Sequence, residues 1–438
     1  MRRLLWPLGL AALICNPSFA GSPAADCGPI RIASDAGRAT ETRPEGPLTL
    51  PGALAITGRV NPDLAAARRE VQVFEAAIRQ ARSRPNPELS AELEDTRPET
   101  RTTRLALSQP IELGGKRAAR IDAADYGRAA AEAKLIASQM RICAAVRVAF
   151  FDALIAQETL ELAQASAELA QRATQVAERR VLAGKVSPIE QTRAQVNEAA
   201  VRVALHAAEK ALTTARSQLA GAVGDETLPV DRLQGDVASL PEWLTRAELA
   251  QHIDAAPAVR QARIALEHSR ARIQVERSRR IPDLSVSVGA QHDSERDLDQ
   301  AIIGVSVPIP LFDRNQGNLE AALRQSDQAR DELMATKLRI ATRLDQALGR
   351  FATARSELTF LERDILPGAQ GAYDAVLKGF ELGKFSFLDV LDAQRTLFSA
   401  RSQQLDALRE AHHAAAALGA LLGDGADDAS LSSVADLR

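Results

Sequence analysis

The stretch Gly383-Lys384-Phe385-Ser386-Phe387-Leu388-Asp389-Val390-Leu391-Asp392-Ala393-Gln394 decides the fold of this chain. It is a short Gly/Ser turn that leads into a helix whose first turns carry two carboxylates. Almost the same turn occurs earlier, at Gly184-Lys185-Val186-Ser187-Pro188-Ile189-Glu190. The chain is therefore expected to contain one structural unit twice.

Prolines and glycines elsewhere in the chain recur at nearly the same distance. The recurring pairs are Pro62 and Pro257 (195 residues apart), Pro87 and Pro282 (195), Pro110 and Pro308 (198), and Gly184 and Gly383 (199). A separation that drifts by only four residues over half of the chain indicates an internal duplication.

Each repeat is expected to contain a helix, two strands, a very long helix, a tight turn and a returning helix. For the first repeat, 61–224, the pattern predicts a helix from 61 to about 84, strands at about 88–95 and 102–109, and helices over 116–183 and 188–223. For the second, 257–423, it predicts a helix from 257 to about 280, strands at about 283–291 and 301–308, and helices over 315–382 and 387–422. Residues 21–60 are expected to be an N-terminal extended segment, 225–256 a connector between the repeats that is polar up to about Pro241, and 424–438 a C-terminal tail.

The spacing of apolar residues in the expected helices and strands predicts what they pack against. Apolar residues in the second long helix follow coiled-coil spacing and predict that it pairs with its return helix; they are Leu344, Leu348, Phe351, Leu358, Leu361 and Ile365. Pro367-Gly368 predicts a kink there. The strands alternate between apolar and polar residues, which predicts one apolar and one polar face. Pro110 and Gly114-Gly115 are expected to end the first strand pair, and a charged loop from His292 to Asp299 to join the second.

Composition limits the class of protein. Hydrophobic residues make up 46% of the chain but aromatic residues only 3%, which is typical of long, closely packed Ala-rich helices. A net charge of −3, from 54 basic and 57 acidic residues, argues against a nucleic-acid partner. A helix of residues 116–183 would extend roughly 100 Å, which no globular core accommodates.

The N-terminus is expected to be an export signal, residues 1–20, because two arginines precede a short apolar run and small residues precede Gly21. Cys27 and Cys143 then remain in a compartment that permits disulfides. They could pair or stay apart, and the sequence does not decide between the two. A lipid-anchored cysteine is a further alternative, which Ile14 before Cys15 and Asp26 before Cys27 weaken.

Export combined with short strands of alternating polarity favours an outer-membrane barrel, with lipid outside and water inside. Four strands are too few to close a barrel, which needs at least about eight. An open sheet edge in lipid leaves backbone groups unpaired at a cost of several kcal/mol each. An oligomer is therefore a physical requirement, and three copies would supply twelve strands.

The chain resembles the TolC-like outer-membrane factor family, in particular its cobalt-zinc-cadmium efflux branch. The resemblance covers nearly the whole mature chain and is carried by five stretches: Asn61–Leu64, Asn86–Ser90, Gln109–Arg117, Val307–Phe312 and Gly383–Gln394. It implies a homotrimer in which α-helical hairpins form a periplasmic α-barrel beneath a twelve-stranded barrel in outer-membrane lipid. It also implies an exit duct for divalent heavy-metal cations, joined through a periplasmic adaptor protein to an inner-membrane, proton-driven transporter of the RND class.

The resemblance also assigns roles to the repeated turns. The tips Gly184, Lys185 and Ser187, and Gly383, Lys384 and Ser386, are expected to contact the adaptor. Asp389 and Asp392 match an acidic ring at the constriction; residues three apart share a helix face, and the helix start favours carboxylates. Their counterparts are Glu190 and Arg193, so the charge is reversed at one position. Two interpretations of Arg193 are open: it pairs with an acid on a neighbouring hairpin in the closed state, or it is a solvated surface residue.

Other functions have little support in the sequence. The six histidines show no zinc-ligand spacing, and neither a nucleophile motif nor a phosphate-binding loop occurs, so no enzyme, metal site or cofactor is expected. His292, Asp293 and Glu295 could contact a passing ion, although an outward, solvated loop is the simpler interpretation. The alternatives to a metal duct are a duct for drugs or secreted proteins, and a periplasmic coiled-coil adaptor without a pore.

Overall fold

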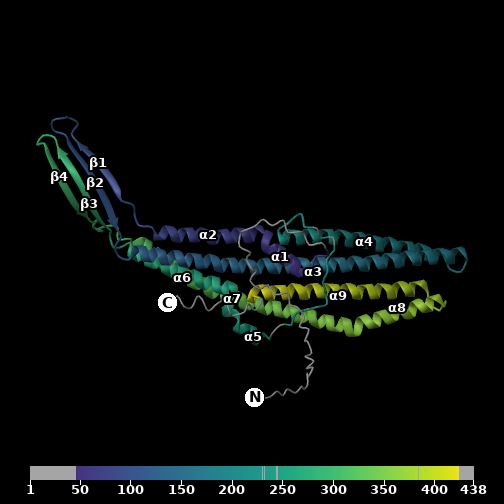
Figure 1. Ribbon diagram of the computed structural model, residues 1–438. Coiled ribbons are helices and arrows are strands. Elements are labelled where there is room, and N and C mark those ends of the chain that lie inside the picture. The colour runs from purple at the N-terminus through teal and green to yellow at the C-terminus, as the bar shows by residue number, and fades with distance from the viewer. Residues whose placement is uncertain (1–45, 229, 231, 243–244, 383, 424–438) are drawn as a thin grey trace, which may run out of the picture.

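The computed structural model describes residues 46–423 except 229, 231, 243–244 and 383. The expected signal segment, Cys27 and the C-terminal tail lie outside these residues. Figure 1 shows an elongated layer of helices running side by side, with a narrow sheet projecting from one end. The chain is thus mainly helical with a small β part, as the sequence predicted.

Both repeats have the expected order of elements. The first contains α2 (Pro62–Arg82), β1 (Glu88–Glu94), β2 (Thr102–Ile111), α3 (Lys116–Leu182) and α4 (Pro188–Val223). The second contains α6 (Pro257–Ser278), β3 (Leu284–Asp293), β4 (Leu298–Ser306), α7 (Gln316–Phe360), α8 (Leu366–Glu381) and α9 (Phe387–Leu422).

Asn61 joins the start of α2 to the end of α4 in the first repeat. Its Oδ1 accepts hydrogen bonds from the backbone N–H groups of Asp63 and Leu64, at 3.0 and 3.2 Å, and so caps the start of α2. Its Nδ2 donates to the carbonyls of Ala222 and Val223 at the end of α4. One side chain therefore satisfies the backbone groups of two helix ends that point at each other.

The expected extended segment 21–60 is wrong over its last residues, because Leu50–Val60 forms helix α1. Thr49 caps this helix by accepting a hydrogen bond from the backbone of Gly52, and a proline lies in its first turn. The helix buries Ala53, Leu54 and Ile56.

The connector between the repeats is not wholly polar and irregular. It contains α5 (Arg246–Gln251) and a 3₁₀ turn (Ile253–Ala255). Leu233 pairs with Leu48 in a short parallel bridge, and Leu233, Val237 and Leu249 belong to the main core. The connector therefore packs against the helical layer.

The sheet has the order β1-β2-β3-β4, and every neighbouring pair is antiparallel. The β1–β2 pair ends at Ser108, as Pro110 predicted, but β2 itself continues to Ile111, and Pro110 lies opposite Ser285 of β3. No β1 residue is paired there, so the missing N–H costs little. The predicted charged loop is also shorter than 292–299, because His292 pairs with Asp299 inside the β3–β4 hairpin.

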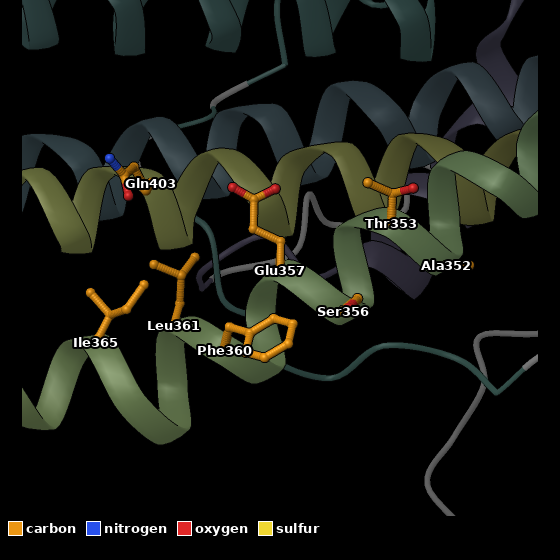
Figure 2. Close-up of a pocket in the computed structure, with 8 residues that line it drawn as sticks. All are labelled: Ala352, Thr353, Ser356, Glu357, Phe360, Leu361, Ile365 and Gln403. Atoms are coloured by element: carbon orange, nitrogen blue, oxygen red, sulfur yellow. The ribbon is translucent and has the colours of Figure 1, made fainter.

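The second long helix is interrupted. A π-helical turn, Leu361–Ile365, separates α7 from α8, and Figure 1 shows the change of direction that Pro367-Gly368 predicted. The N–H of Leu366 donates to Leu361 O, five residues back. Leu361 is buried, but Ile365 is 45% exposed and leaves the predicted apolar seam. Figure 2 shows the open groove here, lined by Phe360, Leu361 and Ile365 on one side and Gln403 of α9 on another.

The helices form one layer with two free sides. Near the sheet the neighbours run α2, α3, α6, α7, and away from it they run α4, α3, α9 and then α7 with α8. The main core lies around Phe150, Leu154 and Ile155 of α3, and a second cluster lies near the hairpin tips. No helix in the described part of the chain combines the length and apolar character needed to cross a membrane.

Candidate functional site at the hairpin tips

The two repeated turns are closed by equivalent backbone hydrogen bonds. At the first, the N–H of Lys185 donates to Arg180 O at 2.9 Å; at the second, the N–H of Lys384 donates to Gly379 O at 2.8 Å. Gly184 has a φ of +67°, a conformation that favours glycine. Its counterpart Gly383 lies outside the described residues. Each hairpin thus ends in the same tight, hydrogen-bonded turn.

Ser187 and Ser386 begin the return helices. Ser187 Oγ accepts a hydrogen bond from Ile189 N at 3.5 Å, and Ser386 Oγ accepts one from Asp389 N at 3.3 Å. Asp389 Oδ2 in turn accepts from both the N–H and the hydroxyl of Ser386, each at 2.8 Å. The second return helix therefore starts with a capping box, and Asp389 has a structural role there.

Asp392 lies one turn further along α9 and is exposed. Among the residues that the structure describes, its carboxylate makes no hydrogen bond or ion pair. The counterparts differ in burial, because Glu190 is half-buried whereas Arg193 is exposed. Arg193 likewise has no ion pair in the described chain, so its expected acidic partner stays a prediction.

Within the two turns themselves, Lys185 and Lys384 are exposed cations. The hydroxyls of Ser187 and Ser386 are engaged in helix caps, whereas these two lysines show no resolved partner within the described residues. The lysine ammonium groups at the tips are therefore open to a partner.

Arg180 links the two hairpins and was not among the site residues predicted from the sequence. Its guanidinium lies over the ring of Phe380, 4.1 Å from the centroid, and its Nη2 donates to Phe380 O at 3.3 Å. Further up, Arg395 donates to the buried side chain of Asn197 at 3.1 Å. One sequence signal was present: Arg180 occupies the position where the second repeat has Gly379.

Phe385 is packed against Gly379. A Cβ placed on Gly379 would come within 2.1 Å of the Phe385 ring. The Phe380 and Phe387 rings lie 6.0 Å apart in the buried cluster behind this contact. Aromatic packing thus fixes the shape of the second tip, whereas the first tip has Val186 in place of Phe385.

A second polar cluster lies where α9 meets α3 and the connector. His412 stacks on Phe151 with centroids 3.5 Å apart, and its Nε2 lies 2.8 Å from Val237 O. Burial lowers the pKa of His412. The neighbouring His413 Nε2 lies 2.7 Å from Asp152 Oδ1, and this bond raises the pKa of His413. These histidines tie the connector and α9 to α3.

The remaining candidate residues are dispersed. Cys143 is buried in α3 and its candidate partner Cys27 is not described, so the disulfide stays a prediction. His292 Nδ1 lies 2.8 Å from Asp299 Oδ1 at the end of the sheet. Within the described ranges, no group of three or more His, Cys, Asp or Glu side chains is placed to hold a metal ion.

Comparison with known proteins gives matches over both repeats. The family pattern described as "Outer membrane efflux protein" matches residues 59–225 and 249–424. The cobalt-zinc-cadmium resistance protein CzcC of Cupriavidus metallidurans is 42% identical over 423 residues, 97% of this chain and 100% of CzcC. The nickel and cobalt resistance protein CnrC of the same species is 29% identical over 354 residues, 79% of this chain and 81% of CnrC.

Solved structures show the same fold at low identity. CusC superposes with a TM-score of 0.71 at 21% identity, over 86% of this chain and 92% of that chain. The outer membrane protein VceC of Vibrio cholerae gives a TM-score of 0.72 at 19% identity, over 86% of this chain and 96% of the VceC chain.

Proposed function

The chain belongs to the outer membrane efflux protein family, and from this we propose that it is the exit duct through which a tripartite, proton-driven pump exports divalent heavy-metal cations. Proteins of this family are outer-membrane channels with a large periplasmic helical part, not enzymes. The adaptor alternative is therefore set aside.

The observation that carries the metal assignment is the 42% identity to a cobalt-zinc-cadmium resistance protein over 97% of the chain. The likeness includes both repeats, hence the sheet, the long helices and the tips together. A metal-binding group such as a His cluster is not required for this role, because a duct needs only to let the hydrated cation pass.

The described sheet supports assembly as a trimer. It has four strands, β1 and β4 are its edges, and one face is apolar. Three copies supply twelve strands and close the sheet, which removes the edges that lipid does not tolerate. The helical layers then continue as a periplasmic tube.

The tips are the proposed docking and closing end of the tube. They lie at the end of the helical layer opposite the sheet, where Lys185 and Lys384 are exposed. A periplasmic adaptor with acidic side chains fits them, and this adaptor would connect the duct to an inner-membrane RND transporter. Asp392 rather than Asp389 is the proposed cation-attracting group of the gate, because Asp389 is engaged with Ser386.

A deletion experiment tests the proposed function. Removal of the chain should lower growth on cobalt, zinc or cadmium, and the full-length chain should restore it. Growth of the same two strains on hydrophobic antibiotics is measured for comparison. Sensitivity to antibiotics with unchanged metal tolerance would instead support a duct for drugs.

A further inference from the structure

Positive charge is concentrated where the helices meet the sheet. Four segments span these connections, 82–87, 112–120, 276–283 and 307–316, and together they form the junction. The junction contains nine arginines and lysines but four carboxylates, although the whole chain has a net charge of −3. The two hairpin turns at the far end of the sheet (Figure 1), 94–101 and 292–299, contain three arginines and seven carboxylates. The two ends of the sheet therefore have opposite charge.

Much of the positive charge of the junction has no partner in the fold. Three of the four carboxylates form ion pairs inside the junction, with Lys116, Arg120 and Arg279. In or beside the junction, exposed arginines whose side chains make no hydrogen bond or ion pair with any residue that the structure describes are Arg82, Arg84, Arg272, Arg277 and Arg280. The unpaired charge is therefore positive and open to a ligand.

The exposed apolar residues of the sheet end at this same level. Leu113 and Ile281 are both exposed and lie close together, because a Cβ on Gly114 would come within 2.7 Å of Ile281. After β4, Leu311 is exposed and Phe312 is 90% exposed. A lysine or arginine lies within three residues of each of these apolar residues along the chain. In an outer-membrane protein, a change from exposed apolar to basic side chains marks the surface of the bilayer, where lipid phosphates lie.

A groove lies next to this boundary, between α2, α3 and α6 of one chain. Its volume is about 790 Å³, and its lining includes the unpaired Arg84 and Arg272. The apolar part of the lining includes Phe74, Ala124 and Val275. The carboxylates that also line it are already paired with arginines. An apolar groove with unpaired arginines matches a ligand that has both an anionic head and a hydrocarbon part.

We propose that the junction binds an anionic phospholipid of the periplasmic leaflet, with Arg84 and Arg272 as the phosphate-binding cations and the start of an acyl chain in the groove. Basic clusters at a membrane surface attract anionic lipids. Arginine suits a phosphate because its planar guanidinium can donate two parallel hydrogen bonds to it. The inference rests on the proposed duct only through the location of the sheet in the outer membrane.

Lipid binding to the full-length protein tests the proposal. The protein in detergent is incubated with phosphatidylglycerol or with phosphatidylcholine of identical acyl chains, and bound lipids are counted by native mass spectrometry. The first variant is Arg84→Gln with Arg272→Gln, and the second is Arg84→Lys with Arg272→Lys, which keeps the charge. The control is Arg141→Gln with Arg343→Gln, because both are exposed arginines outside the junction with no ion pair in the described chain.

We expect the unchanged protein to bind phosphatidylglycerol at a several-fold lower concentration than phosphatidylcholine. The glutamine variant should lose this preference, whereas the lysine variant should keep most of it and the control all of it. The same spectra report whether each variant is still assembled.

Equal binding of the two lipids by the unchanged protein, or an equal loss of preference in the control, would overturn the proposal. Displacement of phosphatidylglycerol by inorganic phosphate would assign the arginines to a free anion instead. Retention on purified peptidoglycan without a preference between the lipids would assign them to the cell-wall polymer. Each of these results would leave the duct standing, because growth on metals tests it separately.

Discussion

Arg180 of α3 lies with its guanidinium 4.1 Å from the ring centroid of Phe380 of α8. This contact joins the two hairpins just behind their turns, and the hydrogen bond from Arg180 to Phe380 O reinforces it. If the duct opens when the hairpins separate, this link must break.

Arg180→Ala should therefore raise the open probability of the duct. A cation–π contact at an exposed site contributes about 0.5–1 kcal/mol and a hydrogen bond about 0.5–1.5 kcal/mol. Loss of about 1 kcal/mol shifts an equilibrium roughly fivefold. Single-channel recording in planar bilayers measures the change. Arg172→Ala is the control, because among the described residues Arg172 forms an ion pair only with Glu168 on its own helix; equal effects of both variants would contradict the prediction.

Asp392 and Asp389, the two carboxylates of the second tip, should have different roles. Asp392→Asn should lower the preference for cations over anions, because it removes one charge per chain from the proposed constriction. Asp389→Asn should mainly weaken the start of α9, since capping interactions contribute about 0.5–2 kcal/mol. Reversal potentials and thermal unfolding measure the two effects. The assignment is wrong if Asp389→Asn alone changes ion selectivity.

Gly379→Ala should disturb the second tip, because the new methyl group would collide with Phe385. Gly371→Ala lies in the same helix with nothing within 4 Å of the new Cβ, and should stabilise it by about 0.5–1 kcal/mol. Hydrogen exchange over residues 379–392 distinguishes the variants. Slower hydrogen exchange in both Gly379→Ala and Gly371→Ala would show that the contact between Gly379 and Phe385 is not needed to hold the shape of the second tip.

The His413–Asp152 bond should make stability depend on pH. The pKa of His413 is raised above its ordinary value of 6.5, so its stabilisation is complete below pH 6.5 and is lost as the pH rises through the raised pKa. His413→Asn should therefore reduce the fall in melting temperature between acidic and mildly alkaline pH. Asp152, Arg409, Glu410 and His412 surround this group. An unchanged pH profile in the variant would show that the bond contributes no pH-dependent stability.

The order of elements was predictable because it is encoded locally and twice. Pro62, Pro188 and Pro257 begin helices, and the turns at Gly184 and Ser386 match in both repeats. Helix α1 and the packed connector were missed, because short segments gain their structure from tertiary contacts such as Leu48 with Leu233. The end of β2 was predicted two residues too early, because the cost of Pro110 depends on whether a neighbouring strand needs its N–H.

The candidate site was predictable in place but not in detail. Repetition located the tips, and the acids Asp389 and Asp392 were visible in the sequence. The different engagement of the two acids depends on the rotamer of Asp389, which reaches back to Ser386. The Arg180–Phe380 contact joins residues 200 positions apart, so no local pattern could indicate it.

The most direct test of the proposed duct is the loss of metal from preloaded cells. Cells with and without the chain are loaded with zinc, cobalt or cadmium, transferred to metal-free medium, and their metal content is followed by elemental mass spectrometry. We predict that loss of at least one of these metals is faster when the chain is present and slows on its deletion. Equal rates of loss of all three metals in both strains would contradict the proposed function.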